Sequence, residues 1–552
     1  MAHTDNELGV PHYWGKTGKT VQKLISTVAI IDFLLFGYDQ GVMSGIISSP
    51  QFRDDFPVAG LGTASSDAST WQAFITAIYA VGCLFGALAV LGWGDTLGRR
   101  KAIFLGAIVM IIGVMIQLTS VPASGKTAAT AQLIIGRFIT GIGNGINTST
   151  VPTYQAECCP PHNRGKLICI EGGNVAIGTL IAYWIDYGSS YGPHAFTWRF
   201  PIAFQCVFAL AVLVLMLRLP ESPRWLLTHG RVDEANTVLA ALHGEHRQDP
   251  GVQTQMAVIQ DAITASGQVG GKTPWGDLLT GGKEQHLRRM LLGAGSQMMQ
   301  QLSGCNAVIY YFPILFENSI KPGDHDFALL MGGINMIVYA VFATTSWFAV
   351  ERVGRRKLFL AGTVGQCLSM VLTFGALLRG TPSAANGAAV GLFTYIAFFG
   401  ATWLPLPWLY PAEINPLRTR AKANAVSTVT NWLWNFFVVM MTPIMVAGTG
   451  PGGWGTYAFF AATNALFFPV LYLLYPETAG RSLEDIDLIF AKGRADGRGY
   501  VRAAAELPRP SAPEGQGMAR GHVGVGTARS DAEKGAPLPE RPAHAVPEAR
   551  PW

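Results

Sequence analysis

Charged residues are scarce in this chain of 552 residues, where Asp, Glu, Lys and Arg together make up 14%. Soluble domains carry roughly 25% charged residues, so this composition favours a membrane protein. The formal net charge is only +5, and the sequence gives no indication of nucleic-acid binding. The seven cysteines lie in apolar runs or at their ends without a repeated spacing, which indicates packing residues rather than a disulfide framework or a metal site.

Motifs for catalysis are lacking as well. The sequence contains no nucleotide-binding loop, no metal-ligating cluster and no Ser/His/Asp arrangement. We therefore expect no enzyme activity, no metal and no cofactor. The N-terminus is polar up to an apolar run that is long enough for a complete span, so no cleavable signal is predicted.

Hydrophobic residues are abundant instead, at 49% of the chain, and they are grouped in runs. Twelve runs approach the length needed to cross a bilayer: 24–47, 71–93, 102–120, 129–154, 166–187, 199–219, 288–316, 327–350, 358–378, 388–410, 422–447 and 454–475. The sequence thus predicts an all-α membrane protein with twelve transmembrane helices in two groups of six.

The domain organisation follows from the positions of these runs. The predicted parts are an N-terminal segment 1–23, a six-helix bundle 24–219, a linker with short helices 220–286, a second six-helix bundle 287–476 and a tail 477–552. The end of the tail has eight prolines between Pro508 and Pro551, among polar and small residues, and cannot build a core. We therefore predict disorder after about residue 495.

Basic residues are distributed unevenly between the loops. They gather in every second loop and in 220–286, whereas 48–70 contains only Arg53, beside three aspartates. Cytoplasmic loops carry an excess of Lys and Arg, so both termini are predicted to face the cytoplasm.

The two halves of the chain repeat each other at a constant offset of 256 residues. The segment 95–100 returns as 351–356, Glu157 with Arg164 returns as Glu413 with Arg420, and 220–221 returns as 476–477. Parallel repeats of a six-helix unit are typical of major-facilitator transporters, whose substrate site lies at the repeat interface.

The repeated charges lie at the cytoplasmic ends of the predicted helices. The set consists of Asp95, Arg99, Arg100, Glu157, Arg164, Glu351, Arg355, Arg356, Glu413 and Arg420. In both halves an acid precedes a base by seven residues, so the two should lie on either side of a short turn and bridge neighbouring helices. We interpret the set as salt bridges that hold the cytoplasmic side shut when the cavity opens outward; alternatively, the charges only anchor helix ends at the headgroups. Surface ion pairs are individually weak, but a few kcal/mol can bias a two-state equilibrium.

Asp39 lies inside the first apolar run, where a carboxylate costs about 3 kcal/mol even by the lower estimates. Arg137 lies in the fourth run, and counting 1.5 Å per residue places both side chains roughly 12–14 Å below the outer surface. We predict that they pair, and that the carboxylate takes a proton when substrate or motion separates them. The alternatives are a static pair, or an Asp39 that caps a helix end or satisfies a packed neighbour. Near Arg137, Gly141, Gly143 and Gly145 form a small-residue face for close helix contact.

Amide and aromatic side chains recur in the spanning runs of the second half. Neutral polyhydroxylated substrates need paired hydrogen-bond donors and acceptors, which amides supply, with aromatic rings against their C–H faces. We therefore predict a small neutral polyhydroxylated substrate, although any one of these side chains alone is more typical of interhelical packing. The candidate substrate-binding residues are Gln300, Gln301, Asn306, Tyr311, Trp408 and Asn431, with Trp432 and Asn435 of the same chemistry. Pro405 and Pro407 should loosen the tenth helix locally, which would suit a gate.

Five motifs resemble the sugar porter family of the major facilitator superfamily. They are Gly94-Asp95-Thr96-Leu97-Gly98-Arg99-Arg100, Pro152-Thr153-Tyr154-Gln155-Ala156-Glu157, Pro220-Glu221-Ser222-Pro223-Arg224-Trp225, the run Gln300 to Tyr311, and Pro476-Glu477-Thr478-Ala479-Gly480. The resemblance covers roughly residues 20–490. It implies twelve helices, alternating access and a coupling role for Asp39 and Arg137. It also implies sugar contacts from Gln300, Gln301, Asn306, Trp408 and Asn431.

Two positions depart from the pattern of hexose-transporting members. Gly172, preceded by Glu171, stands where they usually have a glutamine, and Tyr339 stands where they usually have an asparagine. Three segments look most like the fungal branch that includes the glycerol–proton symporter: 171–173, 182–188 and 489–492. Glu171 is a candidate second titratable or substrate-binding group, or else it makes an interhelical hydrogen bond. Tyr339 joins the candidate substrate-binding positions.

The sequence therefore predicts a plasma-membrane proton symporter for a polyol, such as glycerol, or a monosaccharide. Its expected partners are this solute, H+ and the lipid bilayer; we expect it to act as a monomer and to bind no nucleic acid. A proton-independent facilitator is the nearest alternative, and the state of Asp39 separates the two. A transporter-like nutrient sensor is a further alternative, although such sensors tend to carry a long cytoplasmic signalling tail.

Overall fold

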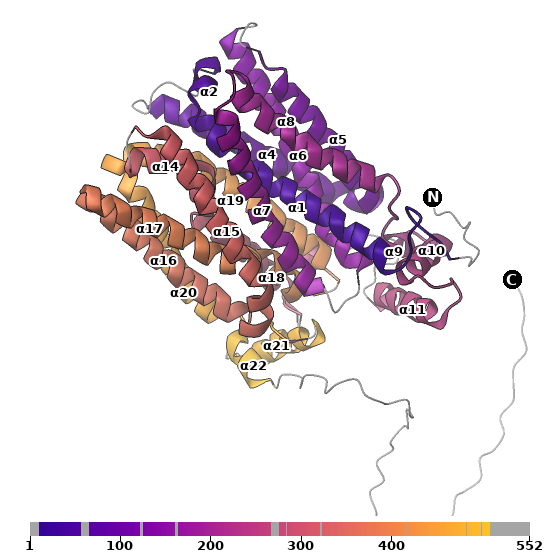
Figure 1. Cartoon of the computed structure of the whole chain (residues 1–552). Helices are drawn as coiled ribbons and strands as arrows, with labels where there is room; N and C mark the ends of the chain where they lie inside the picture. The colour runs from indigo at the N-terminus through magenta and orange to yellow at the C-terminus, as the bar shows by residue number, and fades with distance from the viewer. Residues whose placement is uncertain are drawn as a thin grey trace, which may run out of the picture. The chain divides into compact units, whose positions relative to one another are not determined.

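The protein is a bundle of long helices (Figure 1). The computed structural model describes residues 10–56, 66–121, 125–159, 164–265, 275–282, 284–320, 323–416, 418–481, 483–497 and 499–507. Within these residues no strand occurs, and a single isolated bridge joins Tyr13 and Lys16. The predicted all-α class is confirmed.

Six long helices form the first half of the bundle, drawn from indigo to magenta in Figure 1. They are α1 (Lys19–Ser48), α4 (Ser66–Leu97), α5 (Arg99–Leu118), α6 (Lys126–Cys158), α7 (Arg164–Ser190) and α8 (Phe196–Met216), with the short α2 (Pro50–Asp55) after α1. Four short helices follow: α9 (Pro223–Thr228), α10 (Val232–His243), α11 (Pro250–Ala265) and α12 (Trp275–Leu278).

The second half is drawn from rose-red through orange to yellow in Figure 1. It consists of α13 (His286–Leu302), α14 (Cys305–Ser319), α15 (His325–Val353), α16 (Arg355–Arg379), α17 (Pro382–Phe398), the π-helical turn η3 (Phe399–Trp403), α18 (Leu406–Ile414), α19 (Arg420–Gly448), the 3₁₀ turn η4 (Pro451–Gly453) and α20 (Trp454–Leu474). The helices α21 (Leu483–Ala495) and α22 (Tyr500–Glu506) come after it.

The chain is ordered past residue 495, where the composition predicts disorder. The reason is that α22 packs on α21, with 4.8 Å between the ring centroids of Tyr500 and Phe490. Residues 508–552 lie outside the described part.

Ten helices in the described part are long and apolar enough to cross a membrane. The α6 helix spans a comparable length, 33 residues, but its glycines and polar residues reduce its hydropathy. The apolar run 288–316 is not one helix, because the chain breaks at Gly304 with φ at +101° into α13 and α14. With α6 and this broken pair, the chain makes the predicted twelve crossings.

The tenth crossing is irregular near its middle. The π-helical turn η3 ends at Trp403, and α18 begins at Leu406, so the irregular stretch includes Pro405. Proline lacks the N–H that an uninterrupted helix would use, and local π-helical turns are one way in which a helix absorbs the break. The predicted loosening of this helix is confirmed.

Small residues bring the helices of the first half into close contact. A Cβ added at Gly141 of α6 would lie 2.2 Å from the Tyr79 carbonyl oxygen of α4, and one added at Gly143 would lie 2.5 Å from the Gly106 carbonyl oxygen of α5. Gly145 meets α4 in the same way. The predicted small-residue face of α6 therefore packs against two helices at once.

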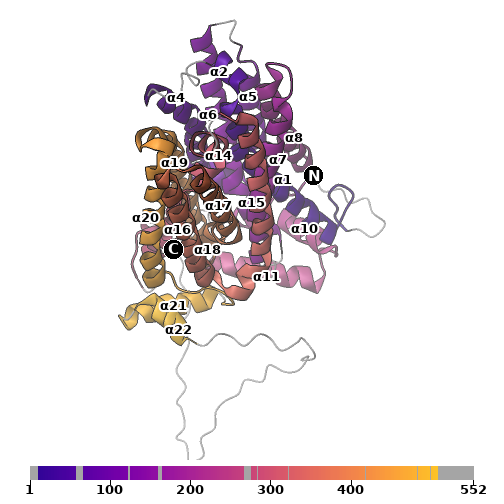
Figure 2. The same cartoon turned by 60° about the vertical axis from the view of Figure 1, so that its left-hand side comes forward.

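The two ends of the bundle differ in what they carry. Figure 2 shows α2 at one end and α11 and α21 at the other. We call the latter the charged end, because the repeated acids and bases lie there. The start of α1 belongs to this end, since the Gly18 N–H donates to the Ala241 carbonyl oxygen of α10 at 2.7 Å. The α1 helix therefore runs away from the charged end.

Candidate transport site

Asp39 lies in α1 and is 2% exposed. The Tyr79 hydroxyl of α4 donates to its Oδ2 at 2.9 Å. Its other oxygen, Oδ1, is buried without a hydrogen-bond partner in the described part of the chain. A half-satisfied carboxyl group in this position is energetically costly when ionised.

Arg137 of α6 is equally buried and lies over the same tyrosine. Its guanidinium carbon is 5.4 Å from the centroid of the Tyr79 ring, and its Nε donates to the Ile75 carbonyl oxygen at 3.0 Å. Its Nη2 has no described hydrogen-bond partner.

Asp39 and Arg137 therefore make no direct ion pair, and the predicted pairing is wrong for this structure. The reason is Tyr79, which offers its hydroxyl to the acid and its ring face to the base. Residue counting placed both groups at one level, but it could not reveal a side chain from a third helix between them.

Four of the predicted amides form a connected network in the second half. The Gln300 Nε2 donates to the Trp403 carbonyl oxygen at 2.8 Å and to that of Leu404 at 3.2 Å, so it satisfies backbone groups at the irregular turn of the tenth crossing. Asn431 of α19 donates to the Gln300 Oε1 at 3.1 Å. Asn306 donates to Gln301, which in turn contacts Gln300.

Gln297 belongs to this network and was missed from the sequence. Its Nε2 donates to the Pro407 carbonyl oxygen at 2.8 Å, and its Oε1 accepts from Asn431 at 2.5 Å. Gln297 precedes Gln301 by four residues and therefore lies on the same helix face, a spacing that would have revealed it.

Aromatic rings join the two halves beside Tyr79. The Trp432 ring of α19 lies 6.2 Å from the Tyr79 ring and 5.3 Å from the Phe36 ring of α1, both edge to face. Trp408 of α18 lies 6.2 Å from the same Phe36. The Trp432 Nε1 and both amide atoms of Asn435 are buried without described hydrogen-bond partners, so their hydrogen-bonding capacity is unused in this conformation.

Two predicted aromatic positions lie outside the described hydrogen bonds of the amide network. The Tyr311 hydroxyl donates to the Val439 carbonyl oxygen at 3.0 Å. The Tyr339 ring is buried and lies 6.0 Å from the Phe399 ring of η3. In this structure both side chains therefore contact neighbouring helices rather than the amide network.

Three further acids are buried in the spanning helices of the first half. Glu171 has an unpartnered Oε2, Asp32 accepts from the Asn147 Nδ2 at 2.9 Å, and Asp186 accepts from the Gly45 N–H at 3.1 Å. Asp32 and Asp186 were not predicted as site residues, although the argument from membrane cost that selects Asp39 applies to Asp32 in the same apolar run.

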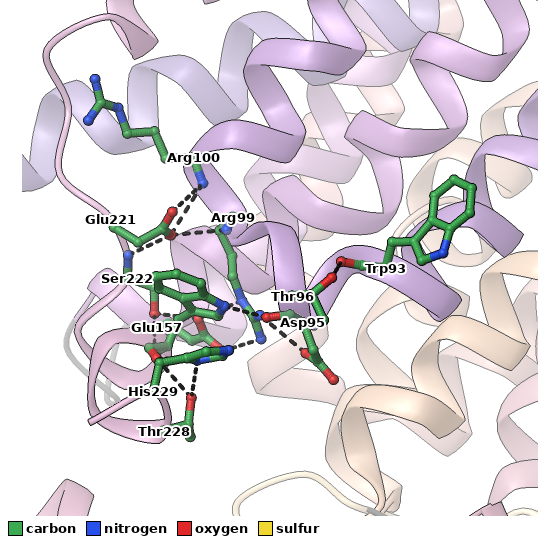
Figure 3. A network of polar contacts seen from close by, with 11 residues as sticks. Trp93, Asp95, Thr96, Arg99, Arg100, Glu157, Glu221, Ser222, Thr228 and His229 are labelled. Atoms are coloured by element: carbon green, nitrogen blue, oxygen red, sulfur yellow. Dashed lines mark hydrogen bonds and ion pairs between the residues drawn. The ribbon is translucent and has the colours of Figure 1, made fainter. Parts of the chain in front are cut away.

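The charged end of the first half is held by one arginine (Figure 3). The Arg99 Nε lies 3.1 Å from Glu157 Oε2, and its Nη1 lies 3.2 Å from Asp95 Oδ1. Glu221 accepts from the backbone N–H groups of Arg99 at 3.0 Å and Arg100 at 3.1 Å. Burial raises the pKa of Glu221, while these N–H groups oppose the rise. The ends of α4, α5, α6 and α8 are thereby tied together.

The second half repeats these contacts. Arg355 lies 2.7 Å from Glu413 and 2.9 Å from Glu351, and Glu477 accepts from the N–H groups of Arg355 at 2.8 Å and Arg356 at 3.1 Å. The guanidinium groups of the following arginines cap helix ends instead: Arg100 donates to the Met216 and Leu217 carbonyl oxygens, and Arg356 donates to that of Tyr472.

Of the two predicted bridges between an acid and a base seven residues apart, the described side chains test only Glu413 with Arg420, and these two form no described ion pair. Glu157 and Glu413 pair with arginines of other helices, Arg99 and Arg355. The Arg420 guanidinium donates to the Asn415 carbonyl oxygen at 3.1 Å, and the side chain of Arg164 lies outside the described residues. The described ion pairs among the repeated charges join helices within one half.

Comparison with known proteins gives consistent matches over nearly the whole described chain. The sequence profile of the family "Sugar (and other) transporter" matches residues 25–490. The chain is 44% identical over 503 residues to the sugar transporter STL1 of Saccharomyces cerevisiae, covering 91% of this chain and 87% of that protein. It is 30% identical to the galactose transporter of the same yeast, covering 86% and 82%. Among solved structures, the proton:xylose symporter XylE aligns with a TM-score of 0.72 at 27% identity, covering 86% of this chain and all (100%) of that one.

Proposed function

Because the chain belongs to the sugar porter family of the major facilitator superfamily, a family of transporters, we propose that it couples uptake of a polyol or monosaccharide to H+. The proposal places it in the plasma membrane as a monomer that works by alternating access, with its charged end and both termini on the cytoplasmic side. The observation that carries it is Asp39, a buried acid with one oxygen free of hydrogen bonds beside Tyr79 and Arg137.

The surroundings of Asp39 suit a group that gains and loses a proton. When ionised, the carboxylate is stabilised by the Tyr79 hydroxyl and by the nearby charge of Arg137. When that support is weakened, desolvation favours the protonated form. The unpartnered Asp39 Oδ1 and Arg137 Nη2 become partners for each other if Tyr79 moves aside.

Tyr79 also connects the acid to the second half. Its ring packs edge to face on Trp432, which lies next in the chain to Asn431 of the amide network. A solute that displaces Trp432 therefore changes the packing of Tyr79, whose hydroxyl holds Asp39. This contact gives solute binding a physical route to proton binding.

The chemistry of the amide network favours a small neutral solute rich in hydroxyl groups. Asn435 and the Trp432 indole supply unpartnered donors and an acceptor, and Trp408 supplies an aromatic face. The resemblance to the fungal branch with the glycerol–proton symporter favours glycerol, and the likeness to a xylose symporter makes xylose the first sugar to test.

A facilitator that uses no proton is the second candidate. One observation favours it: Asp39 and Arg137 make no ion pair, and each already has a hydrogen bond to a neighbouring helix. In that case the two residues would have only a structural role.

The substitution Asp39→Asn separates these candidates. Uptake of radiolabelled glycerol, xylose and glucose is measured in yeast that lacks its own transporters for these solutes. We expect Asp39→Asn to abolish accumulation above the external concentration and to leave counterflow exchange of the same solute, because the variant binds solute but cannot carry the proton.

The matched control is Tyr79→Phe, which removes only the hydroxyl that faces Asp39. It should retain accumulation with a shifted dependence on external pH. Undiminished accumulation by Asp39→Asn would exclude the coupling role.

A further inference from the structure

Asp32 of α1 and Glu171 of α7 are two buried acids outside the coupling group around Asp39. Their exposed fractions are 1% and 2%. The two helices run side by side in the same direction: a Cβ added at Gly37 would lie 1.9 Å from the Val175 carbonyl oxygen, and Gly45 meets α7 eleven residues further along it. This register places Asp32 at the level of residues 170–173, within about one helical turn of Glu171 along the two axes.

The hydrogen bonds of the two acids are incomplete. The Asp32 Oδ1 accepts from the Asn147 Nδ2 at 2.9 Å, whereas its Oδ2 is buried without a described partner. The Glu171 Oε2 is likewise buried without one. The charge of Asp32 acts on Glu171. Two adjacent carboxylates in a low-dielectric interior cannot both stay ionised without compensation, and a single proton held between them removes that conflict.

The surrounding charges do not supply that compensation. The nearest charged or titratable groups are Asp39 on α1 and Cys169 on α7. Tyr79 and Arg137 face Asp39 rather than the pair. From the second half, Glu351 on α15, Arg355 on α16 and Glu413 on α18 act on Cys169. Among the described residues, only Asp39 acts on Asp32 besides its amide partner, and only Asp32 acts on Glu171. No described cation neutralises either carboxyl group.

We propose that Asp32 and Glu171 share one proton and form a second protonation site on the charged-end side of Asp39. This inference rests on the proposed proton-coupled function. Asp32 precedes Asp39 by seven residues, which is about 10 Å along α1 on the same helix face. The proton that leaves the Asp39 carboxyl group passes through water to the remaining carboxylate of the pair. The pair, now with two protons, then releases one to water at the charged end as H3O+ and keeps the other.

Infrared spectroscopy of the purified full-length protein tests the shared proton directly. Difference spectra are recorded over a pH titration in detergent without solute, in the region of the carboxylic acid C=O stretch. We expect one band that both Asp32→Asn and Glu171→Gln remove or shift in frequency, because the two groups share its proton. Loss of a separate band in each variant, or no change in either, would overturn the proposal.

Two kinds of variant control this test. Asp186→Asn removes another buried acid of α7, fifteen residues from Glu171, and should leave the band in place. The conservative variants Asp32→Glu and Glu171→Asp retain the carboxyl groups and should retain a titrating band. They keep the test valid if an amide variant fails to fold.

Transport in proteoliposomes tests the role of the pair in the cycle, with radiolabelled glycerol and xylose as probes. We expect Glu171→Gln to lower accumulation driven by a pH gradient by about tenfold or more, a fall that corresponds to about 1.4 kcal/mol or more. Counterflow should stay within about twofold. An equal fall in both would show a structural role and contradict the relay. A wild type that accumulates neither probe would contradict the proposed function, and the infrared band would still decide whether the pair shares a proton.

Discussion

The two halves of the bundle are alike at the charged end and different in the middle. An offset of 256 residues carries Arg99 to Arg355 and Glu157 to Glu413, and each arginine makes the same contacts in its own half. The same offset carries Asp39 to Gly295 and Arg137 to Phe393. In the described part, the buried acids far from the charged end lie in the first half, and the amide network lies in the second.

The difference separates what holds a half together from what the half does. Both copies keep the ties between their helix ends. The interiors carry different chemistry: groups that can hold a proton in one half, and amides that can bind hydroxyl groups in the other. The edge-to-face contact between Tyr79 and Trp432 is where these two interiors meet.

At the charged end, the two halves also differ in one respect. In the first half the Trp225 indole of α9 donates to the Asp95 carbonyl oxygen at 2.6 Å. The position related by the offset is Arg481, whose guanidinium donates to the Ala504 and Leu507 carbonyl oxygens around α22. The first cluster is therefore tied to the linker, and the second half is tied to the tail.

We expect the largest effect from Gln300→Leu, a change in the amide network of the second half. It tests whether the interiors of the two halves have separate functions. This change removes a donor to the Trp403 carbonyl oxygen and leaves Asn431 without one acceptor, and an unsatisfied buried polar group costs about 1–3 kcal/mol. We expect the half-saturation concentration to rise by about 10- to 100-fold. Sensitivity to a protonophore should persist, because the proton-binding groups are intact.

Kinetics of solute uptake with and without the protonophore check this result. Loss of protonophore sensitivity in Gln300→Leu would show that the two interiors are not separate in function. A variant with unchanged half-saturation would remove the amide network from the solute site.

A smaller effect is expected from breaking the matched ion pairs one at a time. Glu157→Gln and Glu413→Gln each remove a charge-assisted interaction worth about 2 kcal/mol. Glu413→Gln should destabilise more, because the Arg355 side chain is 4% exposed whereas that of Arg99 is 13% exposed. Thermal unfolding of the purified variants measures the ranking, and a larger loss in Glu157→Gln would contradict it.

The smallest effect is expected from Trp225→Phe, which removes one hydrogen bond of the linker and keeps most of the ring packing. A typical hydrogen bond contributes about 1 kcal/mol, so a small fall in the unfolding temperature is expected. The change should speed hydrogen exchange of the amides in α9 and leave exchange of those in α21 unaltered. Equal changes in α9 and α21 would show that the contacts of the linker and of the tail are coupled.

The sequence permits the architecture to be predicted because its signals are local or repeated. Apolar runs long enough to span a bilayer and the 256-residue offset are sufficient for twelve crossings in two halves. The break at Gly304 is hidden, because the run 288–316 has the length of one long span and a glycine within it does not by itself mark a break.

Contact partners were harder to predict than positions. Glu413 and Arg420 are close in sequence, yet the acid pairs with Arg355, 58 residues away, because helix ends from different crossings meet at the charged end. Asp39 and Arg137 lie around one residue, as the residue count suggests, but the intervening Tyr79 comes from another helix. The positions of two residues along their own helices do not reveal a side chain that a third helix places next to both.

The most direct test of the central claim is uptake by the wild-type protein in proteoliposomes with an alkaline lumen. Radiolabelled glycerol and xylose are supplied outside, with and without a protonophore. Proton-coupled transport predicts a transient rise of at least one solute above its external concentration, which the protonophore abolishes. Uptake that only reaches the external concentration, and does so equally with the protonophore, would contradict coupling and leave Asp39 with a structural role.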